Sequence, residues 1–143
     1  MLVVLDTNVL ISSFLNSEGK PGQIIELVKE NRFQIAYDDR ILGEYEDILA
    51  WPKFGIKPAM AHILITHIEL TGKWIDAEIL SSVGFQDPYD LPFAGVFITA
   101  KAQALVTGNF RHFTPLINQE LPVYSPAQFL DRFFSDQQSS ILE

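Results

Sequence analysis

The chain has 143 residues, of which 48% are hydrophobic and 20% charged, a composition typical of one folded globular domain and not of a chain disordered throughout. It contains no cysteine, which excludes disulfides, thiolate zinc sites and a cysteine nucleophile, so any metal must bind oxygen or imidazole ligands. The net charge of −8 argues against binding nucleic acid mainly by neutralising phosphates, unless bound divalent cations reverse the local charge.

The N-terminal segment MLVVLD is apolar but has no basic leader and no small-residue cleavage site, and it soon reaches the charged Asp6. Nowhere does the sequence approach the roughly eighteen uninterrupted apolar residues of a membrane-spanning helix. We therefore expect a cytoplasmic protein without membrane association.

The first half of the chain alternates strands and helices. Residues 2–5 form a short apolar run typical of a buried strand. Residues 22–31 place apolar side chains at helical spacing, and residues 33–37 indicate a second strand. Residues 38–50 then carry an apolar arc that predicts a helix, which a following proline ends. The opening is thus a βαβ unit.

The alternation continues through the second half. Helices are predicted for residues 58–70, after the turn-rich segment 86–92, and from residue 125 onward, and strands for residues 74–75, 104–107 and 121–124. The pattern predicts a three-layer α/β/α domain with a mostly parallel sheet of four or five strands. We expect this domain to cover residues 1–135 and to be followed by a polar tail, residues 136–143.

Polar residues at strand ends are the first candidates for a site, because ligand crevices in open parallel sheets lie beyond the carboxyl ends of the strands. Asp6 follows the first strand directly and Asn109 follows a later one, while Asp90 begins the helix that enters that later strand. Converging carboxylates suit Mg²⁺ or Mn²⁺, which prefer oxygen ligands. Alternative structural roles remain open, because Asp87 and Asp90 both fit as turn or helix-cap residues. The helical periodicity does not show which of the two neighbouring acids, Glu44 or Glu46, faces the candidate site.

Four segments resemble the motifs of the PIN-domain nuclease family, in matching order and spacing. They are Leu-Asp-Thr-Asn-Val-Leu-Ile-Ser at 5–12, Ile-Leu-Gly-Glu-Tyr at 41–45, Asp-Pro-Tyr-Asp-Leu-Pro-Phe at 87–93, and Val-Thr-Gly-Asn-Phe-Arg-His-Phe at 106–113. Each segment is a weak signal by itself, but together they span most of the chain. The subgroup that the sequence most resembles is the toxin component of bacterial and archaeal toxin–antitoxin pairs.

The resemblance implies a Rossmann-like fold and Mg²⁺- or Mn²⁺-dependent hydrolysis of single-stranded RNA, with a cognate antitoxin as partner. Carried over to this sequence, it implies that three acids, Asp6, Glu44 and Asp90, are catalytic and bind the metal. It also implies that polar residues line the site around them, at Asn8, Ser12, Thr107, Asn109 and Asp87.

One position departs from the family pattern. The fourth motif usually has an acid after Thr-Gly, and here that residue is Asn109. An amide oxygen can still bind or orient a metal-bound water, but the loss of a charge implies weaker metal binding or lower activity, for which Asp87 could partly compensate.

Alternatives to an active nuclease remain open, the first of them because of this departure. The first is a catalytically weakened PIN fold that acts as a partner-binding module. The second is a haloacid-dehalogenase-like phosphatase, which would need a second Asp where Asn8 stands. A receiver domain is a further alternative, but it would need a Lys after the last strand, where the sequence has Ser125-Pro126.

The aromatic content predicts self-association. Eleven Phe and two Trp residues exceed what one small core needs, and surplus aromatics favour interfaces. We expect a dimer or higher homo-oligomer, with residues 63–70 and 129–134 as the main contributors.

Overall fold

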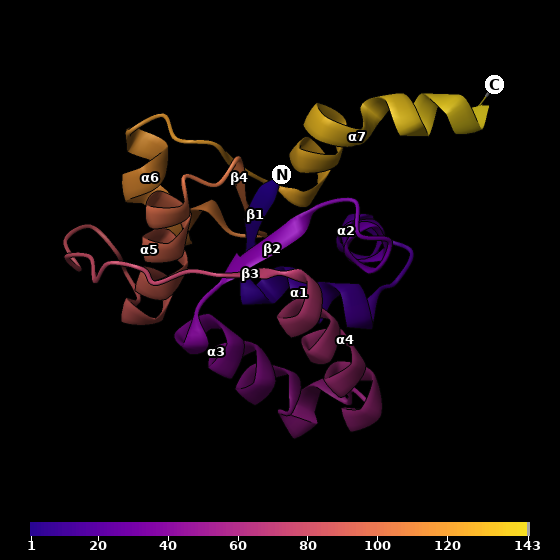
Figure 1. Ribbon diagram of the computed structural model, residues 1–143, viewed down its shortest axis with the longest axis horizontal. Helices are drawn as coiled ribbons and strands as arrows, with labels where there is room; N and C mark the ends of the chain where they lie inside the picture. The colour runs from indigo at the N-terminus through magenta and orange to yellow at the C-terminus, as the bar shows by residue number, and fades with distance from the viewer. Residues whose placement is uncertain (143) are drawn as a thin grey trace.

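Five short strands form the central sheet of the described chain. The computed structural model (Figure 1) describes residues 1–142, with side chains described for residues 1–135. The strands are β1 (Leu2–Leu5), β2 (Gln34–Tyr37), β3 (Lys73–Trp74), β4 (Ala104–Val106) and β5 (Val123–Tyr124), in the spatial order β3-β2-β1-β4-β5. Every neighbouring pair is parallel, with Leu5 opposite Val106 in the central pair.

Helices connect these strands. The α-helices are α1 (Thr7–Leu15), α2 (Lys20–Lys29), α3 (Asp39–Leu49), α4 (Pro58–Thr71), α5 (Leu91–Ala100), α6 (Thr114–Asn118) and α7 (Pro126–Leu142). Single 3₁₀ turns are η1 (Pro52–Phe54), η2 (Pro88–Asp90) and η3 (Phe110–Phe113). Within the described residues, no helix is both long and apolar enough to cross a membrane.

Helices cover both faces of the sheet. Crossover connections between parallel strands are right-handed. Because the strand order runs in opposite directions on the two sides of β1, the helices α1, α2, α3 and α4 cover one face of the sheet, and α5 and α6 cover the other. Figure 1 shows α5 and α6 on one side of the strands and α2 and α4 on the opposite side. The predicted three-layer α/β/α architecture is confirmed, and the sheet is parallel throughout.

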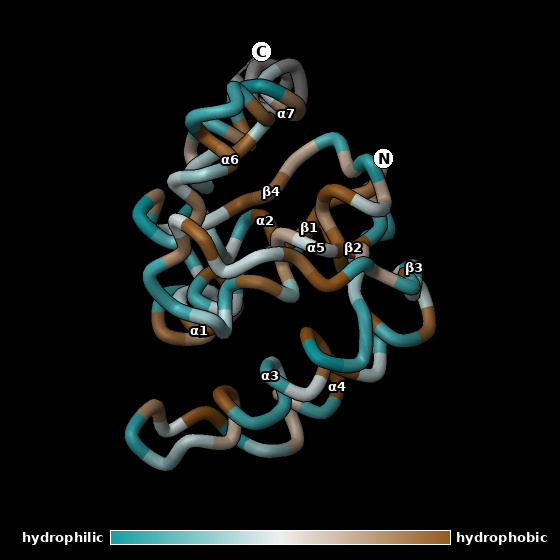
Figure 2. The backbone as a smooth tube through the Cα atoms, turned by 90° about the vertical axis from the view of Figure 1, so that its left-hand side faces the viewer, coloured by the Kyte–Doolittle hydropathy of each residue, from teal (hydrophilic) through white to brown (hydrophobic). Residues whose placement is uncertain are grey.

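The core lies where the strands meet the helices. Val3, Val4 and Leu5 of β1 and Ala104 of β4 are fully buried, as expected for strands covered on both faces. Figure 2 shows hydrophobic segments along the strands and mixed colouring along α3 and α4. The buried residues of these two helices are apolar, Ile41, Tyr45 and Leu49 in α3 and Leu64, Ile65 and Ile68 in α4. Part of the aromatic content is also internal, because Phe33 packs edge-on against Phe129 of α7 at a ring-centroid distance of 5.4 Å.

Most predicted elements are present with ends shifted by one or two residues. Two helices, α1 and α6, are not predicted by the sequence pattern. Helix α1 combines β-branched residues with Ser12 and Ser13, which are poor helix formers, so its formation reflects packing more than intrinsic propensity. Helix α7 extends to Leu142, and the side chains of the predicted tail, residues 136–143, lie outside the described residues.

Candidate metal centre

The candidate site lies where the strand order reverses. From β1 the chain continues toward β2, whereas β4 on the other side of β1 is reached by a crossover along the opposite face. Asp6 and Thr107 directly follow the paired residues Leu5 and Val106 and therefore emerge side by side at the carboxyl edge. Such a switch point is the usual place for a ligand crevice in an open parallel sheet.

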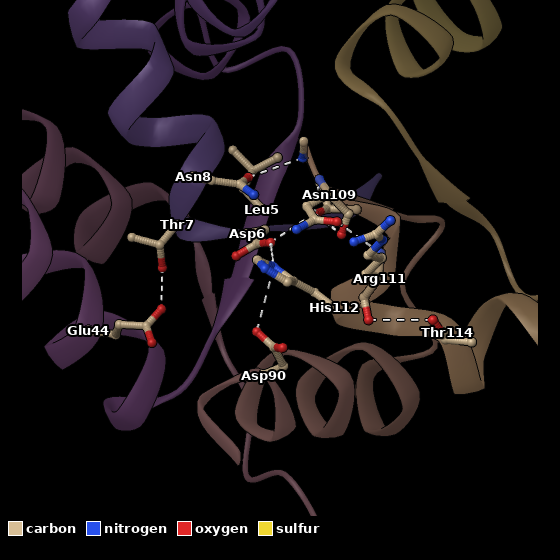
Figure 3. Close-up of polar contacts among 12 residues, drawn as sticks. Leu5, Asp6, Thr7, Asn8, Glu44, Asp90, Asn109, Arg111, His112 and Thr114 are labelled. Carbon is tan, nitrogen blue, oxygen red and sulfur yellow. Dashed lines mark hydrogen bonds and ion pairs between the residues drawn. The ribbon is translucent and has the colours of Figure 1, made fainter. Parts of the chain in front are cut away.

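Asp6 precedes α1 but does not cap it. Its carboxylate makes no capping bond and instead accepts two hydrogen bonds at Oδ2, from Thr107 Oγ1 at 2.8 Å and from His112 Nδ1 at 2.8 Å (Figure 3). The backbone amide of Asn109 donates to Thr107 Oγ1 at 3.0 Å, which holds the threonine hydroxyl toward Asp6. The aspartate is only 4% exposed, so the protein fixes its orientation in a buried position.

Asp90 is the second acid that stands at a helix start without capping it. It is 6% exposed, its Oδ1 lies 3.7 Å from His112 Nδ1, and its Oδ2 is buried with no hydrogen-bond partner within residues 1–135. Burial raises the pKa of Asp90 from its ordinary value of 3.8 to about 7, with smaller contributions from neighbouring acids. Its preceding 3₁₀ turn is capped by Asp87, which accepts from the Tyr89 amide at 2.9 Å.

His112 joins the two aspartates. Because a carboxylate can only accept, Nδ1 of the ring donates to Asp6, and this bond raises the pKa of the imidazole above its ordinary value. His112 is not among the site residues expected from the sequence, although it stands in the fourth motif, because a histidine in a turn usually points into solvent. The signal available in the sequence was its position three residues after Asn109.

Glu44 lies beside this group. Its Oε2 accepts a short hydrogen bond from Thr7 Oγ1 at the start of α1. Burial raises the pKa of Glu44, the bond from Thr7 opposes that rise, and the charge of Asp6 adds to it. One ligand atom each from Asp6, Asp90 and His112 lies within 4.8 Å of the others, and Glu44 is not part of that triplet.

The remaining predicted residues occupy distinct places. Asn8 accepts from the Gly108 amide at 3.1 Å and so ties α1 to the loop after β4. Asn109 Oδ1 caps η3 by accepting from the Arg111 amide at 3.1 Å. Ser12 is exposed one turn after Asn8 and has no side-chain hydrogen bond within the described part of the chain.

The donor set fits a hard divalent cation. It offers the carboxylate oxygens of Asp6 and Asp90, with an imidazole alongside, and the buried Asp90 Oδ2 has no hydrogen-bond partner among the side chains that the structure describes. An unpartnered buried carboxylate oxygen is costly, and a cation would both satisfy it and lower the pKa of the acid. Magnesium and manganese accept such oxygen ligands.

The chain is thus an open parallel α/β/α protein whose candidate ligand site, at the switch point of the sheet, is acidic. The PIN-domain family model matches residues 2–111, so the chain belongs to the PIN-domain family, whose members are in general metal-dependent nucleases.

Comparison with solved structures supports the same fold. The crystal structure of VapBC2 from Rickettsia felis, bound to a DNA fragment from the VapBC2 promoter, is similar with a TM-score of 0.56 and 19% sequence identity. The match covers 87% of this chain and 98% of the other. No curated protein gives a significant match.

Proposed function

We propose that this protein is a Mg²⁺- or Mn²⁺-dependent endoribonuclease that hydrolyses phosphodiester bonds in single-stranded RNA. The observation that carries the proposal is the buried pair Asp6 and Asp90, neither of which caps its helix and both of which converge on His112. Because the chain belongs to the PIN-domain family, we do not propose the haloacid-dehalogenase-like phosphatase as its function.

Asp6, Asp90 and Glu44 would hold the cation, which when bound would activate water and neutralise charge on the phosphoryl group. Thr107 and the Asn109 amide orient the Asp6 carboxylate toward it. Thr7 positions Glu44 at the neighbouring edge of the crevice. The exposed side chain of Arg111 has no ion pair within the described residues and lies beside the acidic group, where it suits a substrate phosphate.

We further propose that the protein is the toxin of a toxin–antitoxin pair and acts in the cytoplasm. The support is the sequence motifs, the PIN family and the fold shared with VapBC2, a toxin–antitoxin complex. An antitoxin that covers the acidic crevice would keep the nuclease inactive in the cell. Co-expression with the product of an adjacent short gene, followed by co-purification, tests this part of the proposal.

The nuclease proposal is tested with a labelled single-stranded oligoribonucleotide. Wild type should cleave it with Mn²⁺ or Mg²⁺, and EDTA should abolish cleavage. Asp6→Asn should reduce the rate by at least about 100-fold, because it removes a charged ligand whose orientation the protein fixes. Glu44→Gln should also lose activity, whereas Glu46→Gln, an exposed acid two residues along the same helix, should cleave like wild type.

A binding module that has lost catalysis is the second candidate. This candidate is favoured by Asn109, because its side-chain oxygen Oδ1 accepts the capping hydrogen bond and brings no negative charge to the centre. Calorimetric titration with Mn²⁺ separates the two. Metal binding without cleavage supports the module, and normal cleavage by Asp6→Asn rules out the proposed centre.

A further inference from the structure

A groove of about 760 Å³ opens directly beside the acidic centre. It runs between α3 and the segment formed by η2 and the start of α5. Glu44 and Asp87 line it close to the acidic centre, and Trp51 lines it beyond the C-terminal end of α3. Its volume is in the range of sites that bind small organic groups. Because Glu44 belongs to both the groove and the candidate centre, whatever fills the groove lies next to the reacting bond.

The surface of α3 facing the groove contains a glycine that packing does not explain. Gly43 lies inside the helix, where glycine is unfavourable compared with alanine. A Cβ built on Gly43 would meet no atom within 4 Å, and the backbone is helical, so neither crowding nor a positive φ requires glycine. What the missing side chain does provide is open space in the groove, next to Glu44.

Beyond the end of α3 lies an exposed aromatic platform. The Trp51 and Phe54 rings are stacked, with centroids 6.2 Å apart and planes 5° from parallel, and Trp51 is 49% exposed. Lys53 Nζ lies 5.9 Å from the Trp51 centroid and 5.3 Å from that of Phe54. Tyr89 of η2, 72% exposed, lines the same groove. Flat exposed rings with an adjacent cation are the elements that bind unpaired bases.

The charges of the groove favour a base over a phosphate. Four acids line it, Asp39, Glu44, Asp47 and Asp87, and the cation that lines it, Arg40, is already ion-paired with Asp38 at 2.7 Å, so a phosphate inside the groove would be repelled. A base is neutral, and its amino groups can donate to a carboxylate. Asp47 is exposed and makes no side-chain hydrogen bond to any described residue, so it is available to accept one.

We propose that this groove holds an unpaired base of the RNA strand next to the scissile bond, with Trp51 stacking on the base, Asp47 accepting from its amino edge and Gly43 leaving room for it. The proposal rests on the proposed ribonuclease function and adds a means of choosing the cleavage position. A groove that reads one base restricts cleavage to unpaired segments, because a paired base cannot leave its helix without cost.

The first test uses Trp51 as a reporter. The chain has two tryptophans, so Trp74→Phe leaves Trp51 as the only one. In a Trp74→Phe/Asp6→Asn protein with EDTA, a single-stranded oligoribonucleotide should quench Trp51 fluorescence in a saturable way. The same strand with abasic residues, and the same sequence as a duplex, should quench at least about tenfold less effectively. Equal quenching by the abasic strand overturns the proposal.

The second test fills the groove. Gly43→Ala should raise the thermal midpoint, because alanine favours the helix, and Gly43→Leu should occupy the space of the base. Gly43→Leu and Trp51→Ala should each weaken oligonucleotide binding about tenfold or more. Ala50→Leu adds the same side chain at an exposed position of the α3 C-terminus outside the groove and should bind like wild type.

The outcomes separate the two proposals. Metal-dependent cleavage with unchanged binding in Gly43→Leu and Trp51→Ala overturns the base groove and leaves the nuclease intact. Base-dependent quenching without cleavage by any metal-loaded wild type supports the groove and overturns the nuclease. Sedimentation that shows loss of self-association in the groove variants, with oligonucleotide binding unchanged, identifies a protein interface and also overturns the base groove.

Discussion

At the scale of single residues, capping distinguishes the acids that support the fold from those of the candidate site. Asp38 and Asp87 both accept hydrogen bonds from backbone amides at the starts of their helices. Asp6 and Asp90 stand at equivalent helix starts and do not. Asp6 instead accepts hydrogen bonds from Thr107 and His112, whereas Asp90 Oδ2 is buried without a hydrogen-bond partner among the described residues. Because a buried carboxylate oxygen without a partner lowers stability, Asp90 is the acid whose position packing alone does not explain.

Metal-free protein should lose stability as the pH rises. The pKa values of Asp90, Glu44 and His112 are all raised in the folded state, Asp90 to about 7. A raised pKa contributes stability that is present below the unfolded value and is lost as the pH passes the folded value. Urea unfolding in EDTA should therefore give a lower midpoint at pH 8 than at pH 5.5.

Two controls accompany this titration. Asp90→Asn should flatten the pH dependence, because it removes the acid whose pKa burial raises to about 7. Added Mn²⁺ should raise the midpoint at pH 8 more than at pH 5.5, since a cation favours the ionised carboxylates. A midpoint that rises with pH in EDTA contradicts the arrangement described for these groups.

A substitution that adds a negative charge at Asn109 tests whether this side chain can reach the metal centre. Asn109→Asp should keep the cap on η3, because aspartate accepts from a backbone amide as well as asparagine does. The added charge should tighten Mn²⁺ binding about tenfold if the side chain can reach the centre. Calorimetry on both proteins measures the change, and unchanged affinity with an unchanged unfolding midpoint would leave Asn109 with a capping role only.

At the scale of elements, close packing of α1 against α2 brings Asp6, Thr7 and Asn8 to the site from the sheet edge and the first turn of α1. The turn between these helices depends on Gly22, which is buried in the first turn of α2. A Cβ at Gly22 would lie 2.0 Å from the carbonyl oxygen of Ser17, so the backbone itself would have to move.

Gly22→Ala should therefore destabilise the fold by roughly 1–3 kcal/mol, as overpacking generally does. Gly43→Ala is the matched control, a helical glycine with free space, and should stabilise by about 0.5–1 kcal/mol. Chemical unfolding of the two variants compares them directly, and effects of the same sign would mean that the α1–α2 turn relaxes easily.

At the scale of the whole molecule, self-association stays a prediction. The burial of the aromatic and apolar side chains indicates which of the two expected segments could form the interface. Phe129 of α7 is fully buried against Phe33 and so serves the chain's own core. Helix α4, in contrast, exposes Met60, Ile63 and Leu70, with Ile63 59% and Leu70 79% exposed. Of the two segments favoured by the sequence, α4 retains more unburied apolar surface.

Sedimentation velocity at high micromolar concentration should give about twice the monomer mass for wild type. Ile63→Lys should shift the protein toward monomer without changing its unfolding midpoint, because the side chain is exposed in the single chain. Lys57→Ala, an exposed residue just before the same helix, serves as control. A wild-type monomer at that concentration contradicts the prediction.

Hydrophobic periodicity and proline and glycine signals act over a few neighbouring residues, so the amino-acid sequence alone predicts the fold class and most of the elements. It also placed Asp6 and Asp90 among the candidate site residues, since a residue after a strand or at a helix start is located by its element alone. It did not predict α1, whose weak intrinsic propensity is overcome by burial of Val9 and Leu10 in the core.

The hydrogen-bond partners of these acids, in contrast, come from elements far apart in the chain and are visible only once the chain has folded. His112 reaches Asp6 across 106 residues of sequence, and Thr7 selects Glu44 over Glu46 by contact between two helices. The same contacts show Asn109 as a cap and Gly43 as open space in a groove. Such features depend on side-chain directions after the layers have packed, and local periodicity carries no information about distances between elements far apart in the chain.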